Sequence, residues 1–242
     1  MLNKTLIGSM LIALSTATSA APVDLSSWLE NGSGTWAVAG DNNSVFQSIN
    51  TPDPAVFFNN SNSQGLALSG QITVETTGDN DFIGFVLGYN DGDSSNASAD
   101  YLLIDWKQGD QSPAVDGLTI SQVSGAFNGA DFWAHTGVVT ELQRATNLSS
   151  TGWNDNQTYD FDLIFTATNV QVSVDGVTEL NINGTFANGS FGFYNYSQSA
   201  VRYAGIEQDI APPTQAPAPE TFLLLLAGLS AMRYSHLRNQ KV

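Results

Sequence analysis

Two pairs of aspartates are the residues of this 242-residue chain best suited to chemistry. Asp79 and Asp81 precede a run of nine residues that is apolar except for its last, Asn90, and Asp91 and Asp93 follow it. Short carboxylates beside glycine are typical of calcium loops, and also of ordinary turns. Asp81 and Asp91 are ten positions apart, about 33 Å along a straight strand, so the two pairs cannot share one ion. We therefore expect the first pair to be the metal candidate and the second to lie in a solvated loop.

The first pair begins like the calcium loop of an EF-hand but does not complete it. The fifth position is Ile83, and the bidentate glutamate required at the twelfth position is missing. The remaining metal hypothesis is a lectin-type oxygen site, in which Asp79 and Asp81 act with backbone carbonyls and a distant acid such as Asp53 or Asp105. The sequence thus predicts a Ca²⁺ site containing Asp79, Asp81 and Asp53, with a solvated turn as the alternative.

The sequence gives little support to catalysis. The segment 21–211 contains one histidine, His135, and no GxSxG, HExxH or P-loop signature. A single histidine beside Trp133 is typical of a structural or hydrogen-bonded rim residue. Asp160 and Asp162 share a strand face, but glycosidases need a closely spaced carboxylate pair inside a cleft. We expect no enzyme and no catalytic residue; the alternative is a secreted polysaccharide-active hydrolase.

The elements that must position these residues are strands. Residues 36–207 alternate apolar and polar positions, with turn residues every eight to twelve positions. The clearest unit is VQVSVDGVTELNI (170–182), in which Asp175-Gly176 is a strong hairpin signal because its turn needs positive φ twice. Many short strands with Gly/Asn turns predict an all-β protein, a β-sandwich of jelly-roll size over residues 21–210.

Composition excludes several classes of protein. The chain carries 23 acidic and seven basic residues, a net charge of −16. Between residues 21 and 211, 22 acids face only Lys107, Arg144 and Arg202, a net charge of −19, so nucleic acid is not expected as a partner. The absence of cysteine excludes disulfides, thiol catalysis and Cys-ligated metals.

Both ends have the composition of targeting segments. Residues 1–20 combine Lys4, an apolar stretch and a small-residue cleavage site, which predicts a secretory signal peptide with a signal helix. Residues 211–220 (APPTQAPAPE) form a proline-rich linker. The uncharged run 221–232 would form an apolar helix of only about 18 Å, short of the roughly 30 Å hydrocarbon core.

The middle of the chain resembles the C-terminal domain of thrombospondins. The match rests on DNDFIGFVLGYN (79–90) and ADYLLIDWKQ (99–108), followed in order by FWAHTG, a GW before a long strand, GSFGFYNYSQ and VRYAGIE. SINTPDPAVFF (48–58), with Asp53, resembles the family's early Asp-Pro segment. The resemblance implies a lectin-like, concanavalin A-type sandwich, calcium association, and adhesion to matrix or cell-surface partners. Two departures are the missing calcium-filled repeats before the domain and the missing late cysteine.

The C-terminal segment 221–242, with the preceding Pro219 and Glu220, resembles the PEP-CTERM sorting signal of Gram-negative bacteria. The resemblance rests on Pro219, Glu220, the apolar run, Arg233 and Arg238, although Thr221 stands where a second proline is usual. It implies recognition by an exosortase, a membrane transpeptidase, transient attachment to the membrane through the tail, and delivery to the cell surface or extracellular matrix. A plain weak anchor is the alternative.

Together these features predict an exported bacterial surface or matrix protein with a calcium-associated domain that binds glycan or a partner protein. A passive structural matrix protein is a further alternative. Six aromatic side chains are candidates either for stacking on sugar rings or for the core, and the sequence does not separate the two uses: Trp36, Trp106, Trp133, Trp153, Tyr194 and Tyr196.

Overall fold

The computed structural model describes residues 20–212. The predicted sorting segment, with Pro219, Glu220, Arg233 and Arg238, lies outside the described residues, as do residues 1–19 of the predicted signal peptide and most of the proline-rich linker. The chain divides into the units Met1–Ala211 and Pro212–Val242, and the fold below is that of the first. Within the described range, no helix has the length and apolar character needed to cross a bilayer.

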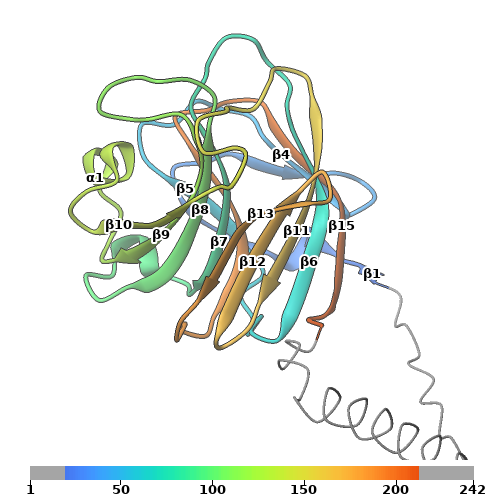
Figure 1. The fold of residues 1–242 in the computed structure, drawn as a ribbon. Helices are drawn as coiled ribbons and strands as arrows, with labels where there is room; N and C mark the ends of the chain where they lie inside the picture. Colours follow the sequence, from blue (N-terminus) through green and yellow to red (C-terminus); the bar gives the residue numbers. More distant parts are fainter. Residues whose placement is uncertain (1–19, 213–242) are drawn as a thin grey trace, which may run out of the picture. The chain divides into compact units, whose positions relative to one another are not determined.

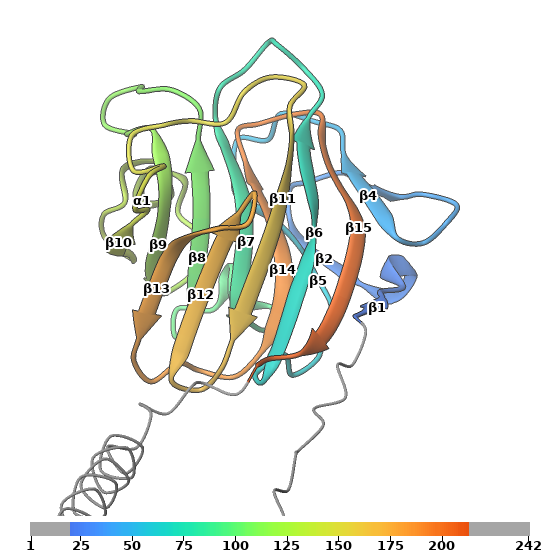
Figure 2. The same ribbon diagram turned by 45° about the vertical axis from the view of Figure 1, so that its right-hand side comes forward.

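Two antiparallel sheets lie face to face (Figures 1 and 2). We call the eight-stranded one sheet A. Its strands pair in the following order, and β1 (Ala21–Pro22) also pairs with β15: β13 (Val177–Asn183), β12 (Asn169–Val174), β11 (Thr158–Phe165), β6 (Leu66–Val74), β15 (Val201–Ile210), β4 (Ser44–Gln47) and β3 (Trp36–Val38).

The second sheet, sheet B, has seven strands. Outside the two sheets, the helical segments of the described chain are short. The 3₁₀ turns are η1 (Leu25–Ser27) and η2 (Asp93–Ser95), and the α-helix is α1 (Gly129–Ala134). The all-β sandwich prediction is confirmed. The strands of sheet B follow in pairing order: β10 (Val139–Arg144), β9 (Gly117–Ser124), β8 (Asp100–Lys107), β7 (Phe82–Tyr89), β14 (Ser190–Tyr196), β5 (Ala55–Phe58) and β2 (Leu29–Gly32).

The predicted hairpin is present. Strands β12 and β13 pair directly, with Val174 opposite Val177. The two residues between them, Asp175 and Gly176, have φ angles of 49° and 75°. Both angles are positive, as a type I′ turn requires, so the local sequence fixes this register.

Aromatic side chains fill the space between the sheets. Phe193 of β14 stacks on Tyr203 of β15 with ring centroids 4.2 Å apart, and Phe85 of β7 packs on Phe161 of β11 at 4.5 Å. Each pair joins one strand of sheet B to one strand of sheet A. Such aromatic pairs contribute about 0.5–1.5 kcal/mol beyond the free energy of burying their surface. They help to hold the two sheets together.

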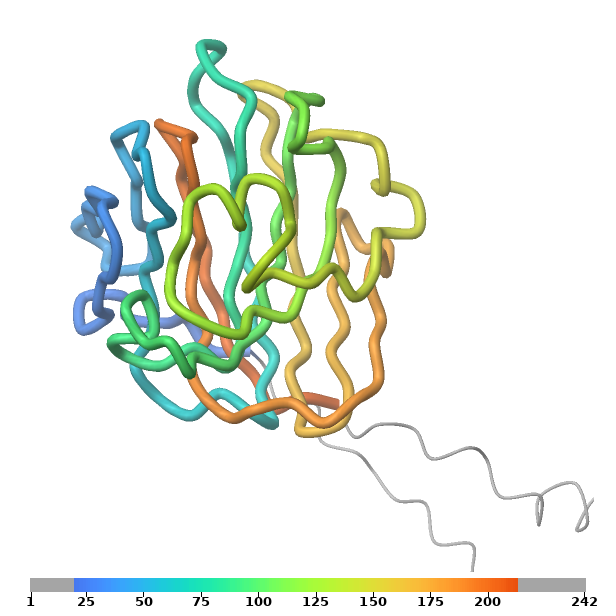
Figure 3. The backbone as a smooth tube through the Cα atoms, turned by 90° about the vertical axis from the view of Figure 1, so that its left-hand side faces the viewer, coloured from blue at the N-terminus to red at the C-terminus, as the bar shows by residue number. Residues whose placement is uncertain are grey.

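Sheet B is buried on its second face as well. Along β8, the even-numbered Leu102, Ile104 and Trp106 face sheet A, while Tyr101 and Leu103 belong to a second apolar cluster on the other side. The segment 125–138, which contains α1, covers this outer face (Figure 3). The covering segment and the sheet beneath it form the setting of the candidate site.

Candidate ligand-binding site

Local sequence explains how the covering segment is held on sheet B. Asn128 caps α1 by accepting hydrogen bonds from the backbone N–H groups of Ala130 (3.1 Å) and Asp131 (3.4 Å). The helix buries Phe132 completely, and Tyr196 of β14 donates its hydroxyl to the carbonyl of Gly129 at 3.0 Å. These contacts give α1 a fixed place over the sheet.

A hollow of about 170 Å³ lies at the C-terminal end of α1. Its polar side chains pair with one another: Glu141 Oε2 is 3.2 Å from Arg144 Nη2, and both side chains are about one-third exposed. The Arg144 guanidinium is also anchored, because its Nη1 donates to the carbonyls of Asp116 and Ser149. The hollow thus presents a carboxylate acceptor and a guanidinium donor together, lined by Pro113, Val115, Trp133, Ala134, His135, Glu141 and Arg144.

His135 connects this hollow to a buried carboxylate. Its Nε2 is 2.8 Å from Oδ2 of Asp105, and its Nδ1 is 3.8 Å from Oε2 of Glu141. Thr119 donates to the other oxygen of Asp105 at 2.6 Å. Burial lowers the pKa of His135, but the Asp105 charge, the hydrogen bond to Asp105 and the Glu141 charge raise it more, so the net pKa is above 6.5. The prediction of a hydrogen-bonded rim histidine describes this geometry.

The backbone at His135 is unusual. With φ at 50° and ψ at 55°, it ends α1 in the left-handed region, which a non-glycine residue seldom adopts. Such conformations persist where the surroundings over-determine them, and they cluster at functional sites. Here the two carboxylates on either side of the imidazole fix its place.

Of the three predicted calcium ligands, Asp81 is already neutralised. Its Oδ1 is 2.7 Å from Nζ of Lys107, and both side chains are buried. Its backbone is also engaged: the N–H donates to Oε1 of Gln198, and the carbonyl accepts from the indole of Trp153. The ammonium balances the charge of this carboxylate, so its attraction for a divalent cation is weakened.

Asp79 and Asp53 lie near Asp81 without completing a cage. Burial and the charge of Asp81 raise the pKa of Asp79, whose carboxylate accepts from the side-chain amide of Asn50. Asp53 is exposed, and its charge, like that of Asp81, raises the pKa of the buried Tyr196 after the larger effect of burial. In residues 20–212, no three His, Asp or Glu side chains are placed to hold a metal ion. The described residues do not fit a calcium site at Asp81, and calcium association elsewhere in the domain stays a prediction.

The second aspartate pair is not simply solvated, as we had expected. Asp91 is exposed, but Asp93 is buried and organises its own loop. Its carboxylate accepts from the backbone N–H of Asn90 at 2.8 Å and from the side-chain amide of Asn96 at 3.1 Å. The expectation was wrong for Asp93 because Asn90 and Asn96 supply enough donors to bury its carboxylate.

The structure separates the two uses of the aromatic candidates. Trp106, Trp153, Tyr194 and Tyr196 are buried in the two apolar clusters, and Trp36 packs against the inter-sheet core. Trp133 is half-buried and lines the hollow. Trp133 is therefore the aromatic residue of this set that is placed to meet a ligand.

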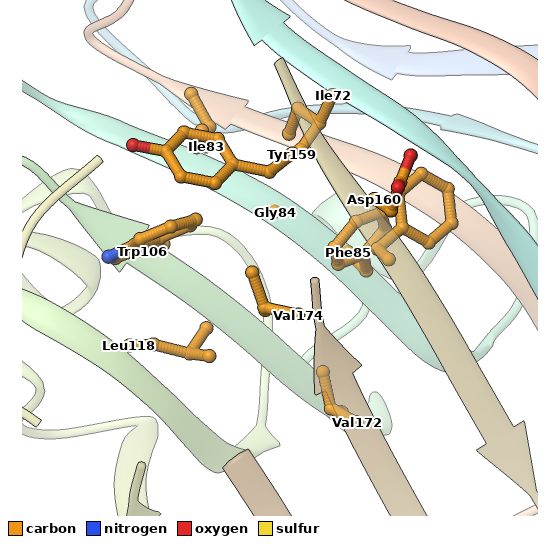
Figure 4. A pocket seen from close by; sticks show the side chains of 11 residues that line it. Ile72, Ile83, Gly84, Phe85, Trp106, Leu118, Tyr159, Asp160, Val172 and Val174 are labelled. Carbon is orange, nitrogen blue, oxygen red and sulfur yellow. The ribbon is translucent and has the colours of Figure 1, made fainter. Parts of the chain in front are cut away.

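Two other hollows are poor candidates. One is a gap of about 10 Å³ between the sheets, where Trp106 and Tyr159 face each other among apolar side chains (Figure 4). It is too small for a ligand. The other lies on the exposed face of sheet A, where Gln71 donates to Asp160 at 3.0 Å and Asp162 lies beside it. Both aspartates are exposed rather than enclosed in a cleft, so they lack the surroundings of a catalytic pair.

The two opposed antiparallel sheets and the covered outer face of sheet B define a lectin-like β-sandwich. The family model of the thrombospondin C-terminal region matches residues 31–210. The chain belongs to this family, as its motifs indicated. A comparison with curated proteins finds no match.

Solved structures share the fold at low identity. The carbohydrate binding module CBM66 from Bacillus subtilis is 11% identical, with a TM-score of 0.54 over 76% of this chain and 95% of that module. The exoplasmic/lumenal domain of VIP36 in a Ca²⁺/Man2-bound form is 13% identical, with a TM-score of 0.54 over 81% and 85% of the two chains. The metal-free carbohydrate recognition domain of Emp46p is 10% identical, with a TM-score of 0.51 over 78% and 90%.

Sequence reasoning missed the polar residues that line the hollow. Neither Glu141 nor Arg144 was a site candidate, and Lys107 was noted only in the charge count and within a family motif. A signal was available in the charge count. In a domain with 22 acids and three basic residues, each basic side chain is expected to pair with an acid. Two of the three, Lys107 and Arg144, lie in or beside the candidate site.

Proposed function

We propose that this chain is an exported surface or matrix protein whose lectin-like domain binds neutral glycans at the hollow beside Trp133. The observation that carries the proposal is the Glu141–Arg144 pair next to a half-buried indole. Sugar hydroxyls need acceptors and donors close together, and the apolar face of a sugar ring stacks on an aromatic side chain. CBM66 and VIP36, whose names or bound states specify carbohydrate, share the fold and support this class of ligand.

Charge favours a neutral glycan over an anionic one. The segment 21–211 carries a net charge of −19, which repels polyanions. At the hollow itself, Arg144 is paired with Glu141, and His135 is paired with Asp105. No unpaired cation is therefore offered to a carboxylate or sulfate group at this site.

Replacing Glu141 with glutamine is expected to weaken glycan binding about tenfold or more, because a charge-assisted hydrogen bond becomes a neutral one. The measurement is isothermal titration of the full chain against soluble neutral polysaccharides (a mannan, a β-glucan and a xylan), with alginate as an anionic comparison.

Asp162→Asn is the matched control, since it makes the same chemical change on the exposed face of sheet A. Equal losses in the two variants would contradict the assignment of the site. Hydrolysis of any of these polysaccharides that disappears in Asp160→Asn or Asp162→Asn would instead support the enzyme alternative.

The sorting part of the proposal concerns the tail. We expect that deleting residues 213–242 moves the protein from the surface fraction of its own cells into the medium, because the apolar run and its basic flank are lost. Immunoblots of the fractions measure this. Substituting Pro219 and Glu220 with alanine should leave a longer, unprocessed form if an exosortase-type enzyme reads them. A deletion variant that stays at the surface would contradict sorting by the tail.

A further inference from the structure

Lys107 lies at the end of β8 with its side chain fully buried. Its ammonium meets three oxygens: Oδ1 of Asp81 at 2.7 Å, the carbonyl of Asn80 at 3.0 Å and Oε1 of Gln111 at 2.5 Å. Two rings complete its surroundings, with Nζ 5.2 Å from the ring centroid of Phe82 and 4.9 Å from that of Trp133. One cation therefore has a shell of oxygens and aromatic faces.

These contacts join three separate parts of the chain. Asn80 and Asp81 precede β7, Gln111 lies in the loop that leads to β9, and Trp133 belongs to α1. A bound metal ion joins distant segments in the same way, by binding carboxylate, carbonyl and amide oxygens from each of them. Because the Lys107 ammonium already supplies a positive charge there, a divalent ion at Asp81 would be repelled at short range.

Lys107 also contacts the aromatic ring that lines the hollow. Trp133 packs edge-to-face on Phe82 at 5.6 Å and on Tyr196 at 5.8 Å, and the Lys107 ammonium lies over its ring. Cation–π attraction to a tryptophan is strengthened when both groups are desolvated. Trp133 also lines the hollow. The orientation of this side chain therefore depends on Lys107.

We propose that Lys107 is an internal cation that takes the role of a calcium ion at Asp81 and positions Trp133 for ligand binding, so that the binding face is organised without metal. The part of this inference that concerns ligand affinity rests on the proposed glycan function. The parts that concern metal independence and the orientation of Trp133 do not.

The test compares wild type, Asp81→Asn, Lys107→Met and the double variant Asp81→Asn/Lys107→Met, all as full chains. Methionine keeps the apolar stem and removes the charge. The readouts are the melting temperature in millimolar Ca²⁺ and in EDTA, the indole N–H resonance of Trp133 (assigned with Trp133→Phe), and affinity for the neutral polysaccharide panel.

We expect the melting temperature of wild type to be the same in Ca²⁺ and in EDTA. Lys107→Met should melt roughly 10 °C lower, because it leaves Asp81 buried and unpaired. The double variant should recover most of that loss, since it removes both charges. In the two variants that carry Lys107→Met, the Trp133 indole resonance should shift and affinity should fall about tenfold. A purely structural ion pair would not require these changes once stability is restored.

Arg202→Met is the matched control. Arg202 pairs with Glu75 and lies 4.8 Å from the ring of Phe46, but on the exposed face of sheet A. The Arg202→Met substitution should leave the Trp133 resonance and the affinity for polysaccharide unchanged. Calcium stabilisation of wild type that is lost in Asp81→Asn would overturn the proposal, as would an unshifted Trp133 resonance in the double variant. If wild type binds none of the polysaccharides, the glycan function fails while the indole and melting readouts still judge Lys107.

Discussion

Replacing Gly84 with alanine is expected to destabilise the domain by about 4 kcal/mol, among the largest effects of a single methyl group in this fold. Gly84 has a φ of 152°, and a Cβ built there would lie 2.0 Å from the carbonyl oxygen of Ile104 on the paired strand β8. The obstacle is backbone, which cannot rotate aside as a side chain can. Strands β7 and β8 would have to separate at the centre of sheet B, and their ladder hydrogen bonds would be lost.

Urea denaturation of the full chain measures this effect. Gly40→Ala is the control, because a Cβ built at Gly40 meets nothing within 4 Å and its φ is not positive. We expect that variant to stay within about 0.5 kcal/mol of wild type. A Gly84→Ala protein as stable as the control would show that β7 and β8 do not approach as closely as described.

Gly84 also explains part of what the sequence suggested about calcium. Asp79-x-Asp81-x-x-Gly84 has the spacing of a metal loop, in which glycine permits a sharp turn. In the structure Gly84 is inside a strand, and its role is to admit the neighbouring carbonyl. Asp81 is paired with a buried lysine. Both residues therefore have structural roles, Gly84 in strand packing and Asp81 in an ion pair. The sequence alone could not distinguish these roles from metal binding.

The sandwich was predictable because its signals are local. Alternation along β11 placed Phe161 and Phe165 on one face, and both are buried; the Asp175-Gly176 turn fixed the adjacent hairpin. The family motifs, which follow one another in a consistent order along the chain, then indicated the lectin-like type of sandwich. The alternation, the turn and each single motif can be read from a window of fewer than fifteen residues.

The candidate site was only partly predictable because its contacts are distant in the chain. Asp81 and Lys107 are 26 residues apart, and Asp105 and His135 are 30 apart. The covering segment depends on α1, a helix of six residues, which is too short to show helical periodicity. Trp133 and His135 were noticed as residue types, but only the tertiary fold brings them to Glu141 and Arg144.

Replacing Asp105 with asparagine is expected to remove most of the pH dependence that His135 gives to the fold. Burial opposes the charged imidazole, but Asp105 and Glu141 outweigh burial and the opposing charge of Arg144, so the pKa of His135 in the folded protein is raised above 6.5. A raised folded-state pKa makes the ion pair's contribution fully present below about pH 6.5, and the contribution is lost as pH rises through the folded-state pKa.

Asp105→Asn keeps the shape of the side chain and removes its charge, so the effect should depend on pH. Near pH 6 we expect a loss of about 3 kcal/mol, because one partner of a buried pair is removed. The difference should become smaller as the pH is raised towards 9 and the imidazolium loses its proton. The measurement is the free energy of unfolding in urea across this range, with Asp160→Asn as an exposed control. Parallel pH profiles for wild type and Asp105→Asn would mean that His135 is not charged in the folded protein. A converging pair of profiles would instead place the protonated imidazole between Asp105 and Glu141, where its charge balances the carboxylate that lines the hollow.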